Sequence, residues 1–86
     1  EGFPPLCPDF VIELRSRSDR LKSLQEKMQE YLASGLQLGW LINPNDGQVE
    51  IYRSRSEQVQ ARSMPAILLG EDILPGFELS LDLNQL

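Results

Sequence analysis

The chain contains no histidine and a single cysteine, Cys7, among its 86 residues. Without histidine it can form no histidine-ligated zinc site, no histidine general base and no serine–histidine triad. One cysteine cannot form an internal disulfide, and a catalytic thiol would lack its usual histidine partner. We therefore interpret Cys7 as an unreactive loop residue, and expect any metal bound here to have oxygen ligands.

Long apolar runs are also missing. No stretch approaches the roughly 20 apolar residues of a membrane-spanning helix, and no charged segment followed by an apolar one forms a leader. Membrane insertion and secretion are therefore not expected, and a cytoplasmic location is. The length of the chain allows one domain at most.

The most informative segment joins a predicted strand, DFVIELRS, to a predicted helix. Alternation along the strand puts its larger apolar side chains on one face, namely Phe10, Ile12 and Leu14. The other face carries three ionisable side chains beside Val11, namely Asp9, Glu13 and Arg15. A solvent-exposed strand face could carry the same pattern, because charged side chains mostly face water.

Spacing limits which of these side chains could act together. At a rise of about 3.3 Å per residue, the backbones of Asp9 and Glu13 lie about 13 Å apart, too far to grip one ion without a bulge. Glu13 and Arg15 lie about 6.6 Å apart and could present a carboxylate and a cation to one phosphate. Carboxylate ligands favour Mg²⁺ or Mn²⁺, which commonly serve phosphate-ester hydrolysis. A second carboxylate must then come from elsewhere.

The segment after this strand predicts an amphipathic helix with Ser18 as its N-cap, Asp19 in its first turn and Gly35 at its end. Its apolar stripe consists of Leu21, Leu24, Met28, Tyr31 and Leu32. Lys27 flanks this stripe and could reach the sheet edge near Glu13. The alternative is a lysine whose stem covers apolar surface while its ammonium stays in water. We expect the helix to cover the Phe10, Ile12 and Leu14 face.

The remaining sequence predicts a sheet. The run LQLGWLIN is typical of a strand covered on both faces, with Trp40 in the core. The turn over residues 44–47 and the segment QVEIYR predict a hairpin, and residues 57–62 another short strand. The segment AILLGEDILPGF predicts a strand and turn before a last strand, FELSLDL.

Five segments in this order resemble a known family: PDFVIELRS, SDRLKSLQEKMQEYLASG, LGWLINP, VEIYR and LPGFELSL. They are similar to the C-terminal half of the Uma-type restriction endonucleases, a bacterial branch of the PD-(D/E)XK nuclease superfamily. The resemblance implies an α/β (α+β) fold, in which one helix packs on a restriction-endonuclease-like mixed sheet with an incomplete core. Residues 1–86 would be the C-terminal part of a single such domain.

The resemblance also implies a site. Asp9 and Glu13 match the family's Pro-Asp…Glu strand, and Glu13-Leu14-Arg15 stands in place of Glu-x-Lys. Arginine stays protonated and can pair with phosphate, but it is a poor base, so Arg15 is an electrostatic candidate.

Further family positions lie outside this tripeptide. A lysine and a tyrosine on the next helix match Lys27 and Tyr31, and Lys27 could replace the missing lysine, with Tyr31 and Ser16 in support. Arg17 departs from an expected proline, and Asn43 from an expected aspartate.

The predicted function is metal-dependent endonuclease cleavage of DNA. Glu13 would bind Mg²⁺ or Mn²⁺, Arg15 and Lys27 would stabilise the scissile phosphate, and Asp9 would orient or supplement the site. One alternative is a non-catalytic module with the nuclease fold that binds DNA or protein. Another is a structural fragment that forms a homodimer through an exposed sheet edge, since small chains with an unpaired edge tend to associate.

The net charge of −5 argues against nucleic-acid binding, because phosphate backbones favour basic surfaces. Five basic residues nevertheless gather in the strand–helix unit, namely Arg15, Arg17, Arg20, Lys22 and Lys27, whereas only acids follow Ser63. A local basic surface could meet DNA. Ordinary solvated helix charges, with Lys22 paired to Glu26, explain the same pattern.

Overall fold

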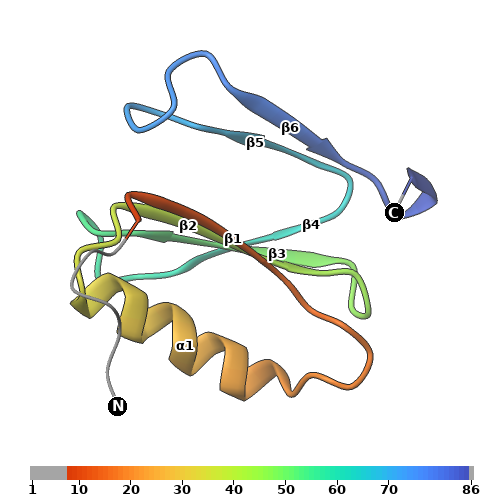
Figure 1. Cartoon of the computed structure of the whole chain (residues 1–86). Coiled ribbons are helices and arrows are strands. Elements are labelled where there is room, and N and C mark those ends of the chain that lie inside the picture. The colour runs from red at the N-terminus through yellow and green to blue at the C-terminus, as the bar shows by residue number, and fades with distance from the viewer. Residues whose placement is uncertain (1–7, 86) are drawn as a thin grey trace.

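Six strands and one α-helix lie within residues 8–85, the part of the chain described by this computed structural model. The elements are β1 (Phe10–Leu14), α1 (Leu21–Ala33), β2 (Leu38–Asn43), β3 (Gln48–Arg53), β4 (Gln60–Ser63), β5 (Ala66–Leu69), β6 (Glu78–Leu81) and the short 3-10 helix η1 (Leu83–Gln85). Strands β1 to β4 form one sheet in that order, and β5 and β6 form a second (Figure 1). This confirms the predicted α+β fold. The prediction that Cys7 is a loop residue concerns a position outside the described residues.

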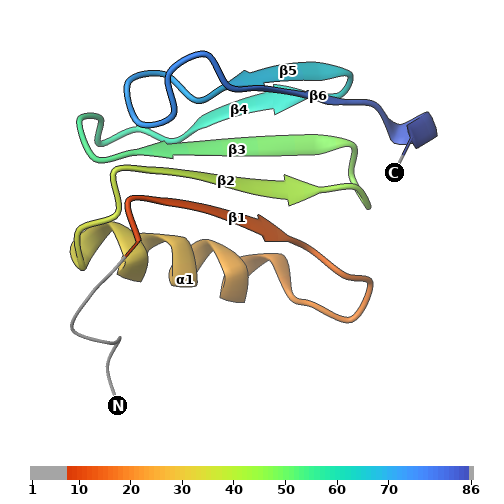
Figure 2. The same cartoon turned by 45° about the horizontal axis from the view of Figure 1, so that its top comes forward.

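The first sheet is mixed. Strands β1 and β2 are parallel and are joined through α1, whereas β2, β3 and β4 are antiparallel neighbours (Figure 2). The predicted hairpin between β2 and β3 is confirmed, and Gly47 takes a φ of 64° in its turn, a value that favours glycine. The register places Glu13, Leu41, Glu50 and Ala61 in one row across the four strands.

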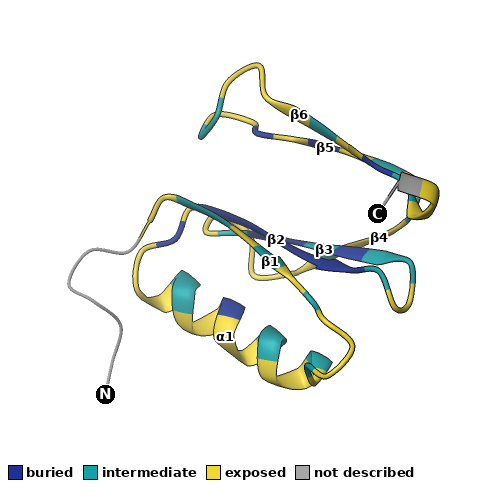
Figure 3. Cartoon of the chain, turned by 45° about the vertical axis from the view of Figure 1, so that its right-hand side comes forward, coloured by how far each residue is buried: buried dark blue, intermediate teal, exposed yellow. Residues whose placement is uncertain are grey.

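Two apolar layers enclose the central strand β2, all six residues of which are buried, as predicted (Figure 3). On the helix side the buried side chains are Met28, Leu36, Leu41 and Tyr52. On the other side Trp40 is fully buried, 4.8 Å from the ring of Phe10 and 6.1 Å from that of Phe77 between centroids. The prediction that Trp40 belongs to the core is therefore confirmed.

The prediction of which face of β1 the helix covers was wrong. Helix α1 packs on the face that carries Val11 and Glu13, not on the face of Phe10, Ile12 and Leu14. The reason lies in β2, where Gly39 has no side chain: a Cβ there would lie 2.6 Å from Met28 Cε. The helix can approach the sheet closely over this glycine, and the ionisable row of β1 therefore lies beside the helix.

The predicted start of the helix was also wrong. Arg20, not Ser18, is the N-cap, and no side chain caps the helix. Asp19 instead accepts the backbone N–H of Ser16 at 2.9 Å, and this hydrogen bond lowers the pKa of Asp19. Asp19 thus closes the turn before the helix, and the backbone becomes extended at Arg20, which has a ψ of 129°, so the helix begins only after it. Gly35 follows the helix end, as predicted.

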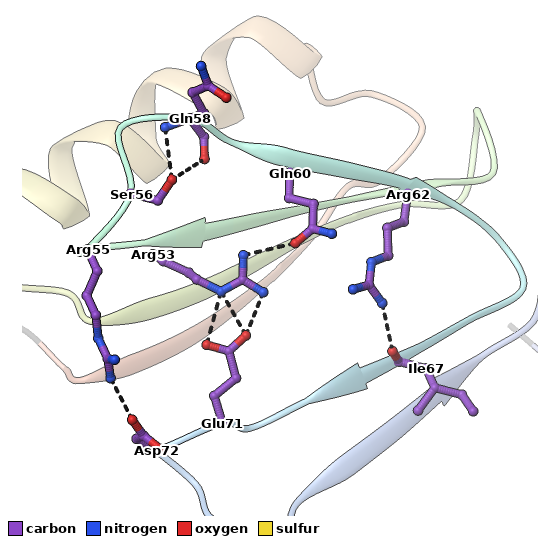
Figure 4. Close-up of polar contacts among 9 residues, drawn as sticks. All are labelled: Arg53, Arg55, Ser56, Gln58, Gln60, Arg62, Ile67, Glu71 and Asp72. Atoms are coloured by element: carbon purple, nitrogen blue, oxygen red, sulfur yellow. Dashed lines mark hydrogen bonds and ion pairs between the residues drawn. The ribbon is translucent and has the colours of Figure 1, made fainter.

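Polar contacts attach the second sheet to the first (Figure 4). Arg53 of β3 pairs with Glu71 at 2.6 Å and donates to Gln60 of β4 at 2.9 Å. Arg62 of β4 donates to the carbonyl oxygen of Ile67 in β5. Strand β4 starts at Gln60, later than predicted, and its Gln60 and Arg62 side chains both lie on the side of the second sheet.

No helix among residues 8–85 combines the length and apolar character that crossing a membrane requires.

Candidate active site

Glu13 and Lys27 form an ion pair where α1 flanks β1. Glu13 Oε2 lies 3.2 Å from Lys27 Nζ. The Glu13 side chain is 18% exposed and that of Lys27 is 44% exposed, so the carboxylate is shielded while the ammonium reaches solvent. The hydrogen bond to Glu13 raises the pKa of Lys27, against burial, which lowers it. The ammonium therefore stays protonated at neutral pH.

Tyr31 lies one helical turn after Lys27. The ammonium nitrogen is 5.9 Å from the centre of the Tyr31 ring, within the range of a cation–π interaction. This contact restricts Lys27 to the flank of the helix that faces Glu13.

Arg15 lies on the same face of β1 as Glu13, but its hydrogen bonds are to other residues. Its Nη1 donates to Asn43 Oδ1 at 3.2 Å and lies 3.4 Å from Asp46 Oδ2, and its Nε donates to the carbonyl oxygen of Asp19 at 3.1 Å. Asn43 is 2% exposed and also donates to Asp46 at 3.0 Å. The guanidinium thereby joins the end of β1 to the β2–β3 turn and to the loop before α1.

Asp9 and Ser16 lie at opposite ends of β1. Asp9 Oδ1 accepts Gln37 Nε2 at 3.1 Å, and its carbonyl oxygen accepts the backbone N–H groups of Gln37 and Leu38. Ser16 shares a 3.3 Å hydroxyl contact with Ser18 in the loop before α1. Of the predicted site residues, the structure thus joins Glu13, Lys27 and Tyr31 through direct contacts, while Asp9, Arg15 and Ser16 have other partners.

Glu13 fits a metal site as one carboxylate ligand. Within residues 8–85 no three cysteine or acidic side chains come together as a ligand group. Mg²⁺ is commonly held by only one or two carboxylates together with water and substrate phosphate. The carboxylate is partly shielded and next to a cation, so it could hold such an ion only with further ligands from other residues or from the substrate.

A second polar cluster, which was not predicted from the sequence, lies on this face of the sheet. Glu50 accepts the Tyr52 hydroxyl at 2.6 Å and Gln25 Nε2 at 2.7 Å. The alternation of QVEIYR places Glu50 and Tyr52 on one face, but the sequence does not show that Glu50 shares a row with Glu13.

The mixed sheet with one helix packed on it matches a nuclease-like fold. Residues 1–83 match the family described as "Uma2: Putative restriction endonuclease", and the chain belongs to this family. This confirms the resemblance drawn from the sequence.

The chain is also similar to a crystal structure described as "a putative nuclease belonging to DUF820 from Anabaena variabilis ATCC 29413". The two share 27% sequence identity with a TM-score of 0.70. The match covers 92% of this chain and 43% of the other, so this chain spans less than half the length of that protein. A comparison with curated proteins gave no match.

Proposed function

We propose that this chain is the C-terminal part of a single restriction-endonuclease-like domain that cleaves DNA phosphodiester bonds with Mg²⁺ or Mn²⁺. The observation that carries the proposal is the 3.2 Å pair of Glu13 and Lys27, in a chain of the restriction-endonuclease family. The partial coverage of the similar nuclease supports a site completed by residues beyond those described.

In this proposal Glu13 is a metal ligand. The bound ion would supply Lewis acidity at the phosphate and lower the pKa of a bound water. Lys27 lies at the rim with its ammonium partly in solvent, and can donate to a phosphate oxygen while remaining near Glu13. Tyr31 keeps the ammonium on this flank through the contact with its ring.

Arg15 and Asp9 act from the two ends of β1. Arg15 adds positive charge on the Glu13 face, and its contacts with Asn43 and Asp46 fix its position. Asp9 orients or supplements the site from the start of β1, where its carboxylate accepts the side-chain amide of Gln37. Ser16, in the loop after β1, is the remaining supporting residue.

Cleavage of supercoiled plasmid DNA by the full-length protein tests this function. With Mg²⁺ or Mn²⁺ we expect cleavage that a chelator abolishes and that Glu13→Gln lowers about 100-fold or more, since the change removes the ligand charge but keeps the size. Circular dichroism would confirm that the variant is folded. Equal cleavage by both proteins would contradict the role of Glu13. DNA binding without cleavage would favour the non-catalytic alternative.

Strand β1 carries the surface that we propose for self-association. Within residues 8–85 it pairs only with β2, and Ile12 and Leu14 are 41% and 60% exposed beside the other edge. An unpaired edge next to exposed apolar side chains favours pairing with another chain. In sedimentation the 86-residue chain should form dimers or larger species, and Ile12→Lys should shift it toward monomer. A wild-type chain that stays monomeric at high concentration would rule this out.

A further inference from the structure

A groove of about 480 Å³ lies on the flank of α1 opposite the candidate active site. Glu50 and Tyr52 of β3, with Val59 and Ala61, form its floor, and helix side chains that include Gln25 form its wall. This volume is in the range of ligand pockets in proteins. We call it the Glu50 groove.

Glu50 brings a negative charge that has no ion-pair partner among the described residues into this groove. Its two carboxylate oxygens accept the Tyr52 hydroxyl and the Gln25 amide, at 2.6 and 2.7 Å. Burial and the hydrogen bond to Glu50 raise the pKa of Tyr52, so the phenol stays protonated and remains a donor. No cationic side chain among the described residues lies within ion-pair distance of Glu50. Each carboxylate oxygen can accept a further hydrogen bond, so the site favours a cation.

The groove adjoins the unpaired edge of a strand. Strand β4 pairs only with β3 within residues 8–85, and Ala61 lies directly beside Glu50 in the register. The side chains of Gln60 and Arg62 lie on the opposite face (Figure 4), and Ala61 offers only a methyl group. A strand added outside β4 would lie two strand spacings from β3, about 10 Å. A long side chain on it could cross Ala61 toward Glu50.

We propose that this edge and groove bind an extended segment of a partner polypeptide, which pairs with β4 and places a lysine or arginine side chain over Ala61 against Glu50. Backbone hydrogen bonds to the edge would supply affinity, and the basic side chain would supply specificity. The negative charge of Glu26 on the groove wall adds to the attraction, while Lys22 opposes it. This surface is separate from the candidate active site, and the inference does not depend on nuclease activity.

A matched pair of labelled peptides tests the proposal by fluorescence anisotropy with the full-length protein. Each is a capped seven-residue peptide of alternating threonine and valine, with either arginine or citrulline at its centre. Citrulline keeps the shape of arginine but is neutral. We expect the citrulline peptide to bind about 10- to 100-fold more weakly, the effect of one hydrogen bond to a charged group.

Three variants locate the effect. Glu50→Gln should remove the preference for arginine, and so should Ala61→Ile, which fills the floor while suiting an exposed strand. Glu26→Gln, on the groove wall, should keep most of the preference. Thermal melting would show that each variant is folded.

Several results would overturn the proposal. They are failure of both peptides to bind, equal affinity of the two peptides for the wild type, and an arginine preference that survives in both Glu50→Gln and Ala61→Ile. Free ethylguanidinium that binds as tightly as the arginine peptide would identify a small cation as the ligand, and would also overturn it.

Discussion

The two flanks of α1 each hold a carboxylate on the same face of the same sheet, but the two carboxylates have different partners. Glu13 in β1 lies 3.2 Å from the ammonium of Lys27. Glu50 in β3 accepts two neutral donors, Tyr52 and Gln25, and has no cation within ion-pair distance among residues 8–85. One residue of β2 separates the two in the row. Their place in the sheet is therefore similar, and the helix residue that faces each one decides its chemistry.

Mobility adds to this difference. The side chain of Lys27 is long and 44% exposed. In the proposed function this allows its ammonium to move from Glu13 to a phosphate of the substrate. Tyr52 is 2% exposed, and its hydroxyl remains with Glu50. This contrast supports the proposals that the Glu13 flank serves reaction chemistry and that the Glu50 flank binds a basic side chain of a partner.

Among the variants that distinguish the two flanks, Lys27→Met is expected to have the largest effect, a loss of DNA cleavage. Removing the ammonium should lower DNA cleavage by the full-length protein about 100-fold or more, whereas Lys27→Arg should retain more of the rate. Lys22→Met is the matched control, because it removes the same charge from the groove side of the same helix. Equal losses in the two methionine variants would show that only the net charge of the helix matters.

Both flanks depend on the close approach of α1 to β2, which Gly39→Val should disturb. The first carbon of the new side chain would meet Met28 Cε at 2.6 Å and Leu36 Cδ2 at 2.8 Å. Overpacking of this kind costs about 1–3 kcal/mol, so the variant should melt at a lower temperature. Ser23→Ala, on the exposed side of the helix, should melt like the wild type. Unchanged melting of Gly39→Val would contradict the packing described here.

Arg15 tests how far the candidate active site extends along β1. Arg15→Ala should cost about 1–3 kcal/mol of stability, because Oδ1 of the buried Asn43 loses the hydrogen bond that Arg15 donates to it. The same variant should also lower cleavage. Arg15→Lys restores the tripeptide of the superfamily and should retain or raise cleavage, although it loses the forked geometry. Similar cleavage rates in the two variants would identify Arg15 as a structural charge only. Urea unfolding and plasmid cleavage measure the two effects.

The smallest expected effect is the pH dependence of the Glu13–Lys27 pair. The folded-state pKa of Lys27 is raised above its usual 10.5, so the stability from this pair is present below pH 10.5 and is lost as pH rises through the folded value. Such a partly exposed pair contributes less than about 1 kcal/mol. The difference in unfolding free energy between wild type and Lys27→Met should therefore shrink between pH 8 and strongly alkaline solution. A difference that grows over this range would show the opposite sign.

Local patterns in the sequence were enough to predict most of the elements. The alternation of DFVIELRS, the stripe of α1 and the apolar run around Trp40 each depend on short-range spacing, and all three predictions agree with the structure. The face covered by the helix was not predictable in this way, because it depends on the close approach at Gly39. The N-cap was missed because Asp19 bonds to the turn before it, instead of to the helix.

The candidate site was predictable only in part. The family resemblance indicated Glu13 and Lys27, and the structure shows them in contact. The partners of Arg15 depend on the position of the β2–β3 turn, and the Glu50 groove depends on the register between strands. Both are contacts between distant segments, which periodicity cannot reveal.

Manganese binding by the full-length protein, followed as the loss of the free-ion electron paramagnetic resonance signal, most directly tests the different roles of the two flanks. Glu13→Gln and Glu50→Gln make the same chemical change on the same face of the sheet. We expect Glu13→Gln to weaken Mn²⁺ binding about tenfold or more and Glu50→Gln to bind Mn²⁺ like the wild type, because only Glu13 is proposed as a metal ligand. Unchanged binding in Glu13→Gln, or an equal loss in Glu50→Gln, would contradict this expectation.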